Sequence, residues 1–170
     1  EALADETSQS VAVAVWGKGG TKIVRLEEPA QPLHVNLRTG TVMSLVNTAT
    51  GRLFAAYMPP KVVERLLSEE ISRLSYGTVQ GPPVDSDTLE TLLAETRKHG
   101  LARTRGQPIP GIDALCAPVF DSAGHLVLGI LVMGPAATFD SEWDGVIAGP
   151  LRQCAQEVSR RIGRDYPQER

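Results

Sequence analysis

Side chains that could do chemistry are sparse in this sequence and form no recognisable catalytic motif. The three histidines, His34, His99 and His125, fall in an expected strand, at a helix end and at a hairpin turn. Zinc-protease, paired-cysteine, phosphate-loop and serine-hydrolase signatures are missing, so these reaction classes lack their minimal residues. We therefore expect the histidines to be structural or solvated, and we expect neither a metal nor a cofactor.

Cys116 is the best candidate for a nucleophile. It lies in the apolar segment ALCAPV, where no adjacent charge can lower the pKa of its thiol, so we predict an inert buried thiol. A small hydrolase or isomerase that uses Cys116 stays open as an alternative, and it would need a histidine or carboxylate in hydrogen-bond reach. Cys154 is also in apolar surroundings, and two free thiols favour a reducing, cytoplasmic compartment.

Residues 47–51, NTATG, are the segment most suited to ligand capture. Small side chains at a helix start leave backbone N–H groups accessible, and the positive end of the helix dipole favours a carboxylate there. Asn47, Thr48 and Thr50 also carry side-chain oxygens that cap helices, so plain capping explains the same pattern. Both interpretations stay open at this point.

Composition and charge favour one soluble domain without a nucleic-acid surface of its own. The chain has 170 residues, 42% of them hydrophobic, and a net charge of −3, so it lacks the broad basic field of DNA-binding domains. Its apolar runs are shorter than a membrane span, so we expect no membrane contact. The sequence opens with Glu1 and not with methionine, and we expect it to be a piece of a longer protein.

Two predicted β-hairpins organise the chain. The main one joins residues 112–120 to residues 125–133 through the turn DSAG, and its second run, LVLGILVM, is apolar enough to be the central strand. An earlier hairpin joins residues 11–16 to residues 21–28. Residues 33–38, LHVNLR, alternate apolar and polar side chains, as a half-buried strand does.

Helices are predicted between and after these hairpins. Asp87 and Gly100 are expected to cap a helix at its two ends. Asp140 is expected to begin a long amphipathic helix that runs to about Gly163 and that Gly149-Pro150 must kink or break. A loop is expected over 101–111. Residues 2–10 are predicted to be the end of a helix that runs into a turn. Helices are also predicted over 53–58 and 61–68, and an irregular or helical segment follows over 69–77. Strands around a helical middle indicate an α+β fold with helices packed on a sheet.

Four segments resemble, in the same order, the effector-binding domain of IclR-type bacterial transcription regulators. These are TATGRLFAAY followed by Pro59, TRKHG, PGIDALCAPVFDSAGHLVLGILVMGP and CAQEVSRRIG, and the resemblance spans essentially the whole chain. It implies a GAF-like or profilin-like curved antiparallel sheet whose pocket binds a small organic effector. It also implies self-association to a dimer or tetramer, and DNA binding only through a winged helix-turn-helix domain upstream of Glu1.

The resemblance also implies a set of pocket residues. Arg103 or Arg105, in the loop 103–110 above the pocket, is expected to add a charge-assisted contact to a carboxylate if that loop folds inward. By position, the pocket itself maps onto Met43, Leu45, Ala49, Thr50, Gly51, Ala114, Cys116, Leu131 and Met133.

The sequence departs from the family at the pocket. Relatives that bind small oxo-acids carry hydroxyl or thiol groups at the positions of Ala114, Leu131 and Met133, and the loop at 103–107, often acidic in relatives, reads RTRGQ. These departures predict poor binding of glyoxylate or pyruvate, and better binding of an acid with an apolar or aromatic body. The open alternatives are a GAF-like signalling module with another output domain and the Cys116-dependent enzyme.

Overall fold

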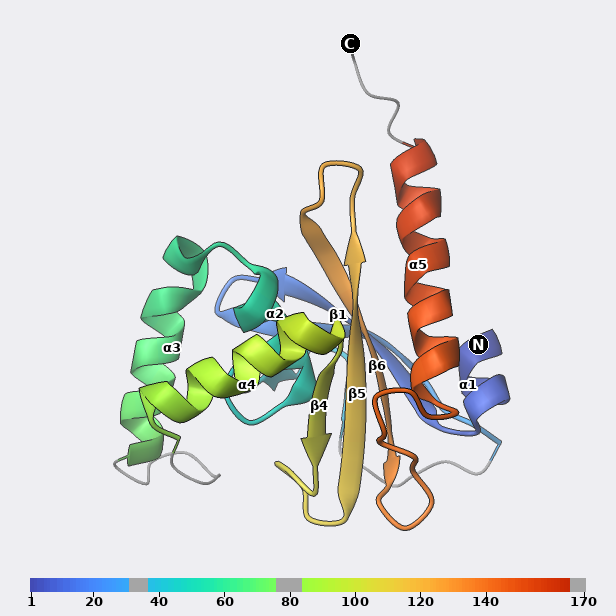
Figure 1. Ribbon diagram of the computed structural model, residues 1–170, viewed down its shortest axis with the longest axis horizontal. Helices are drawn as coiled ribbons and strands as arrows, with labels where there is room; N and C mark the ends of the chain where they lie inside the picture. The colour runs from blue at the N-terminus through green and yellow to red at the C-terminus, as the bar shows by residue number, and fades with distance from the viewer. Residues whose placement is uncertain (31–36, 76–83, 166–170) are drawn as a thin grey trace.

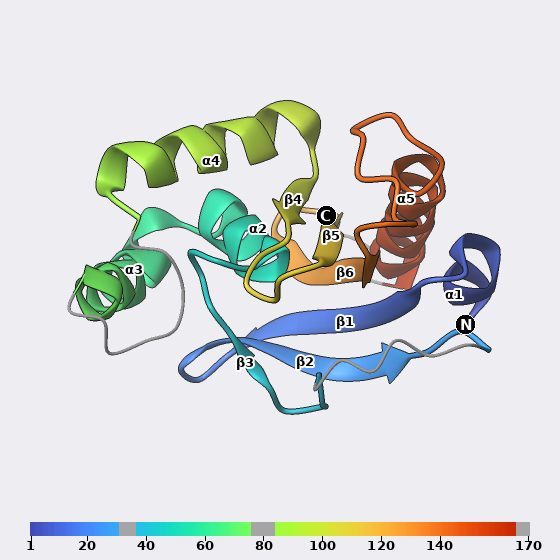
Figure 2. The ribbon, with the colours of Figure 1, turned by 90° about the horizontal axis from the view of Figure 1, so that it is seen from below.

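The computed structural model describes residues 1–30, 37–75 and 84–165, and its centre is a six-stranded antiparallel sheet that curls (Figures 1 and 2). Both predicted hairpins are confirmed, and the apolar strand β6 lies inside the sheet between β1 and β5, where both of its faces are covered. In spatial order the strands are β3 (Val42–Met43), β2 (Gly20–Glu27), β1 (Ser10–Gly17), β6 (Leu126–Pro135), β5 (Ile112–Phe120) and β4 (Ala102–Arg105).

Helices cover both faces of this sheet, which confirms the α+β prediction. The long C-terminal helix and the short N-terminal helix pack on one face, and α2 packs on the other, with α4 beside it and α3 farther out (Figure 1). The helices are α1 (Ala2–Thr7), α2 (Ala49–Tyr57), α3 (Pro60–Ser75), α4 (Ser86–His99) and α5 (Ala148–Asp165).

Strand β5 separates two hydrophobic cores through the ordinary alternation of its side chains. Leu115, Ala117 and Val119 join the core under α5, whereas Ala114 and Cys116 join the core under α2. Successive residues of β5 therefore belong to different compartments, and the compartment under α2 holds the candidate site.

The predicted cap of α4 at Asp87 was wrong by two residues. The Asp85 carboxylate accepts the backbone N–H of Thr88 at 2.7 Å, so Asp85 is the N-cap and Asp87 lies within the first turn. At the other end Gly100 adopts a left-handed conformation with φ 64°, as predicted. A helix start with two nearby carboxylates is ambiguous in sequence, because only the backbone path decides which one reaches the amide.

The predicted start of the last helix at Asp140 was also wrong. The Asp140 carboxylate accepts the N–H groups of Glu142 and Val146, both at 3.0 Å, and so folds this segment into turns before the helix. Helix α5 begins at Ala148, which places Pro150 in its first turn. A proline there removes no helical hydrogen bond, so the helix needs no kink.

The loop predicted over 101–111 contains strand β4. Its four residues pair with β5, with Arg105 opposite Asp113 and Thr104 opposite Ala114. Four residues are too few to show a strand alternation among the surrounding turn-formers, and pairing with β5 supplies the missing stabilisation. The short strand β3 was likewise not predicted.

Helix α2 begins at Ala49, within the segment 47–51 that was predicted as a helix start, and Thr48 is its N-cap. Helix α3 continues to Ser75 as one helix, into the segment that was predicted to be irregular or helical. The predicted strand over 33–38 falls mostly outside the described residues, and the two that are described, Leu37 and Arg38, are not in a strand.

Candidate functional site

A small cavity of about 60 Å³ lies on the α2 face of the sheet. It is bounded by the N-terminal end of α2, by strands β3, β4, β5 and β6, and by the connection between β4 and β5, which passes beside α2 (Figure 2). Most of its lining is apolar. The lining residues are Leu37, Met43, Thr48, Ala49, Thr50, Thr104, Gln107, Pro108, Ile109, Ile112, Ala114, Leu131 and Met133.

Residues at the start of α2 that line this cavity carry free hydrogen-bond donors. The Thr48 hydroxyl caps the helix, accepting the N–H of Gly51 at 2.9 Å and donating to the carbonyl of Ser44 at 2.6 Å. The N–H groups of Ala49 and Thr50 have no hydrogen-bond partner among the described residues, as expected for the first turn of a helix. The Thr50 hydroxyl is fully buried and is also unpartnered there.

Gly51 lets the first turn of α2 lie directly on the preceding turn. A Cβ at this position would come within 1.8 Å of the Ser44 carbonyl oxygen and 2.5 Å of the Leu45 Cα. A glycine is therefore required by the close approach of two backbone segments. Gly51 itself is absent from the cavity lining, although it was predicted as a pocket residue.

The side chain of Glu70, on α3, hydrogen-bonds to the same turn. Its carboxylate accepts the Ser44 hydroxyl and the N–H of Leu45 at 2.9 Å, with a longer contact of 3.4 Å from the N–H of Val46. The turn that leads into α2 is thus held by α3, which sequence reasoning did not foresee because residues 44 and 70 are far apart in the chain.

Of the ten predicted pocket residues, the structure brings six to the cavity. Leu45, Gly51 and Cys116 are buried but do not line it. The six that line it are Met43, Ala49, Thr50, Ala114, Leu131 and Met133.

Arg105 is directed away from the cavity. It lies on β4 next to Thr104, and adjacent strand residues point to opposite faces, so Thr104 lines the cavity and Arg105 does not. Its guanidinium donates to the Ser141 hydroxyl at 2.9 Å and pairs with Glu142 at 3.1 Å. The contact to a carboxylate that we expected from an inward-folded loop therefore has no support in this arrangement.

Cys116 has the character of a core thiol. It is fully buried, and burial raises the pKa of its thiol to about 12, against the opposing influence of the neighbouring Thr50 hydroxyl. Among the described residues, neither a histidine nor a carboxylate bonds to it. A nucleophile needs both a thiolate and an adjacent base, so the arrangement disfavours the Cys116-dependent enzyme.

Several lining residues were missed at the level of sequence. Thr104 would have followed from recognising β4, because its neighbour two residues back, Ala102, already faces the α2 core. Ile109 and Ile112 stand in a Pro- and Gly-rich stretch whose path the sequence does not determine. Of the lining residues that were not named individually, Thr48 belongs to the predicted capture segment 47–51, and four belong to the loop 103–110 that was placed above the pocket: Thr104, Gln107, Pro108 and Ile109. Leu37 and Ile112 were not connected with the pocket.

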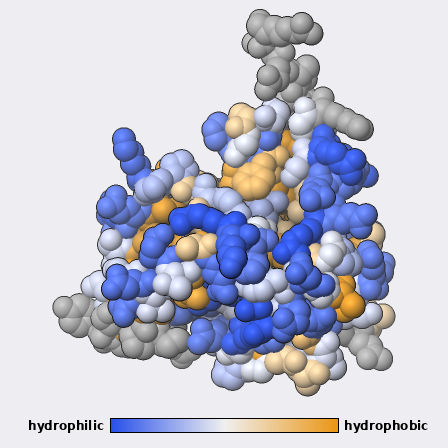
Figure 3. All heavy atoms as spheres, in the orientation of Figure 1, coloured by the Kyte–Doolittle hydropathy of each residue, from blue (hydrophilic) through white to orange (hydrophobic). Residues whose placement is uncertain are grey.

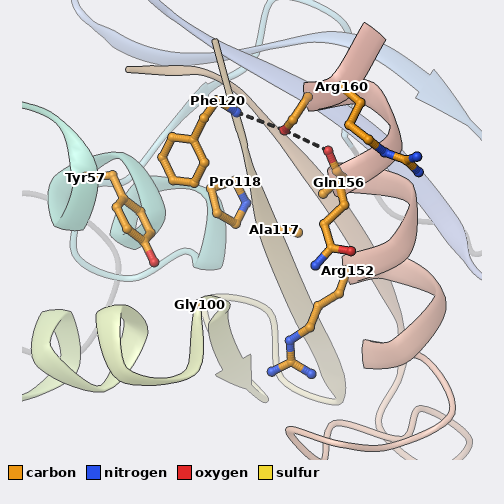
Figure 4. Close-up of a pocket in the computed structure, with 10 residues that line it drawn as sticks. Tyr57, Gly100, Ala117, Pro118, Phe120, Arg152, Gln156 and Arg160 are labelled. Atoms are coloured by element: carbon orange, nitrogen blue, oxygen red, sulfur yellow. Dashed lines mark hydrogen bonds between the residues drawn. The ribbon is translucent and has the colours of Figure 1, made fainter. Parts of the chain in front are cut away.

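A larger open groove of about 610 Å³ lies on the other side of β5, beside α5 (Figure 4). Apolar surface shows between the hydrophilic surfaces of α4 and α5 in this region (Figure 3). Two of its polar side chains are already engaged: Ser159 accepts the N–H of Phe120 at 3.1 Å and donates to Ala155, and Arg152 donates to the carbonyls of Trp143 and His99. Tyr57, Gln156 and Arg160 also line the groove.

The family model of the bacterial transcriptional regulator IclR C-terminal domain matches residues 1–160 of this chain. The chain belongs to this family. No helix in the described residues is long and apolar enough to span a membrane. The IclR C-terminal family consists of transcription regulators and not enzymes, which agrees with the state of Cys116.

Solved structures similar to this IclR C-terminal domain support the assignment. Pseudomonas aeruginosa HmgR superposes with a TM-score of 0.84 at 32% identity, covering 95% of this chain and 63% of that chain. The Thermotoga maritima IclR superposes with a TM-score of 0.79 at 25% identity, covering 95% and 64%. The glycerol operon regulatory protein of Streptomyces coelicolor is 28% identical over 167 residues, which are 95% of this chain and 62% of that protein. The chain thus spans somewhat under two thirds of these relatives.

Proposed function

We propose that this chain is the ligand-sensing domain of an IclR-type transcription regulator, and that the cavity at the start of α2 binds a small organic acid. The observation that carries the proposal is that two lining residues of a mostly apolar cavity hold three unpartnered donors, the N–H groups of Ala49 and Thr50 and the Thr50 hydroxyl. A carboxylate satisfies such donors, and the helix dipole favours its charge.

The opposite wall argues for an apolar body on the ligand. Ala114, Leu131 and Met133 offer no hydrogen bond to the second polar group of an oxo-acid, and an unpaired buried polar atom costs about 1–3 kcal/mol. Glyoxylate and pyruvate are therefore expected to bind poorly. Each buried CH₂ contributes about 0.8 kcal/mol, so an aliphatic or aromatic acid is favoured.

The size of the cavity adds a requirement. At about 60 Å³ it is well below the roughly 300–1,000 Å³ typical of ligand pockets, so a larger acid needs its wall to move. The segment 107–109 forms the outer wall, belongs to neither a helix nor a strand, and Ile109 is 43% exposed. We infer that this segment moves outward when the ligand enters.

The DNA-binding activity of the regulator is proposed to lie in another part of the protein. DNA binding is assigned to a domain outside this chain, because the chain carries a net charge of −3 and matches only part of its regulator relatives. Association into a dimer or tetramer is the proposed means by which two such domains act together.

The test compares wild type with Thr50→Val in a thermal-shift screen of small oxo-acids, aliphatic acids and aromatic acids. An acid at 100 times its Kd adds about 2.7 kcal/mol of stability, which is roughly 5–11 °C for a domain of this size. Thr50→Val removes an unpartnered buried hydroxyl, so the ligand-free protein should be at least as stable while the shift with acids shrinks.

Thr96→Val is the matched control, because Thr96 is equally buried in a helix but its hydroxyl donates to Leu92 at 2.9 Å. It should lower stability and leave the ligand response unchanged. Shifts produced by glyoxylate and pyruvate alone, or shifts of equal size in Thr50→Val and wild type, would contradict the proposed ligand class and its binding site.

A further inference from the structure

Arg52 is a buried cation without a carboxylate partner. It lies in the first turn of α2 and is only 6% exposed. Its Nε donates to the Val46 carbonyl at 2.7 Å and its Nη1 to the Arg103 carbonyl at 3.2 Å. Among the described residues, none of its nitrogens lies within 4.0 Å of a carboxylate oxygen. Both of its hydrogen bonds therefore go to neutral groups.

This charge is poorly compensated by its surroundings. Burial lowers the pKa of Arg52, and the attraction of Glu95 opposes that shift only in part. Glu95 also lies 3.9 Å from Arg103 and its side chain is 43% exposed, so one half-exposed carboxylate faces two guanidinium groups. Buried charges in proteins are normally paired, because an unpaired one is costly to hold.

Arg52 joins two segments that lie next to lining residues of the cavity. Val46 belongs to the turn that leads into α2, and Arg103 is bonded to Thr104, which lines the cavity on β4. The two other arginines of this region have different partners. Arg103 stacks on the Trp143 ring at 4.0 Å, and Arg105 pairs with Glu142.

We propose that Arg52 makes the cavity selective for anions. Its charge raises the potential at the start of α2, where the Thr50 hydroxyl and the free N–H groups of Ala49 and Thr50 can donate to a carboxylate. Its two hydrogen bonds hold the turn before α2 to strand β4. Arg52 is a positioning residue that acts on the ligand through space. This inference rests on the proposed function, since it names the charge of the ligand and the residue that selects it.

The experiment uses probes small enough for the cavity as it stands, acetate and its neutral analogue acetamide. Titrations are followed by the NMR shifts of the Ala49 and Thr50 amides at constant ionic strength. In wild type, acetate should shift both amides and acetamide should act more weakly. In Arg52→Gln the affinity for acetate should fall by about tenfold, the size of a charge effect across several ångströms of protein, while that for acetamide stays unchanged.

Two variants distinguish the effect of the Arg52 charge from that of its two hydrogen bonds to carbonyl groups. Arg52→Lys keeps the charge but loses the two-carbonyl bridge, and it should retain most of the acetate affinity. Arg97→Gln is the matched control, because the Arg97 Nε also donates to a carbonyl of α2, that of Ala56 at 3.0 Å, but Arg97 is paired with Glu90 and is far more exposed. It should behave as wild type.

If Arg52→Gln does not fold, wild type still tests the inference. A buried charge is weakly screened, so acetate affinity should hardly change between low and high ionic strength, whereas a surface site would lose much of it. Equal loss of acetate and acetamide in Arg52→Gln, or no acetate effect on the two amides in wild type, overturns the inference.

The two proposals fail in different ways. If acetate binds in an Arg52-dependent manner but larger apolar acids do not bind, the proposed ligand class is wrong and the role of Arg52 stands. If larger acids bind Arg52→Gln as tightly as wild type, the role of Arg52 is wrong and the proposed function stands.

Discussion

Gly51→Ala is expected to damage both the stability of the domain and its cavity. The added methyl group would lie 1.8 Å from the Ser44 carbonyl oxygen and 2.5 Å from the Leu45 Cα. Both are backbone atoms, which cannot rotate aside as the end of a flexible side chain can. The Glu70 carboxylate also holds this turn through Ser44 and Leu45, so the turn cannot withdraw freely.

The expected magnitude follows from this distance. Ordinary contacts of a Cβ begin at 3.4 Å, so the helix start must move away by roughly 1.5 Å. Overpacking of a core costs about 1–3 kcal/mol, and displacement of backbone belongs at the upper end of that range. A loss of about 3 kcal/mol lowers the midpoint of thermal unfolding by roughly 6–12 °C.

The assay is thermal unfolding followed by circular dichroism, with Gly163→Ala as the control. Gly163 is also helical, in α5, but an added Cβ would find only the Ser122 Cβ, at 3.9 Å. Alanine favours a helix over glycine by about 0.5–1 kcal/mol, so this variant should melt at the same or a higher temperature. A Gly51→Ala midpoint within about 2 °C of wild type would refute the reasoning, because the backbone contact would then be easily relieved.

Two further predictions concern side chains around the cavity. Glu70→Gln should weaken the hold on the pre-α2 turn and cost about 1–3 kcal/mol, with faster hydrogen exchange of the Leu45 amide, whereas Glu69→Gln should leave that amide unchanged. Cys116 should resist a thiol reagent at pH 8 until the protein unfolds, since its pKa is about 12, while the half-buried Cys154 reacts first. Rapid labelling of Cys116 in the folded protein, mapped by mass spectrometry, would disprove this.

Local patterns in the sequence determined the two hairpins and the position of the central strand. Continuous apolar character over the second run of the main hairpin requires cover on both faces, and β6 has it. Thr48 as a helix cap and Gly100 as a helix end were also predictable, because caps depend on atoms within a few residues of each other.

The same local rules failed where two residues competed for one role. Asp85 and Asp87 both precede the apolar face of α4, and Asp140 precedes turns that resemble a helix start. A sequence pattern ranks such candidates by spacing alone. The path of the backbone decides which oxygen reaches which amide.

Only the tertiary structure decided the composition of the cavity. Strand β4 forms because its backbone pairs with the edge of β5. Since adjacent strand residues point to opposite faces, Thr104 lines the cavity and Arg105 lies on the other face. The poor compensation of the Arg52 charge likewise depends on segments that are distant in the chain. The same holds for the hydrogen bond between Glu70 and Ser44. Sequence periodicity records which faces are apolar, whereas burial, pairing and register arise from contacts between segments that the sequence does not place side by side.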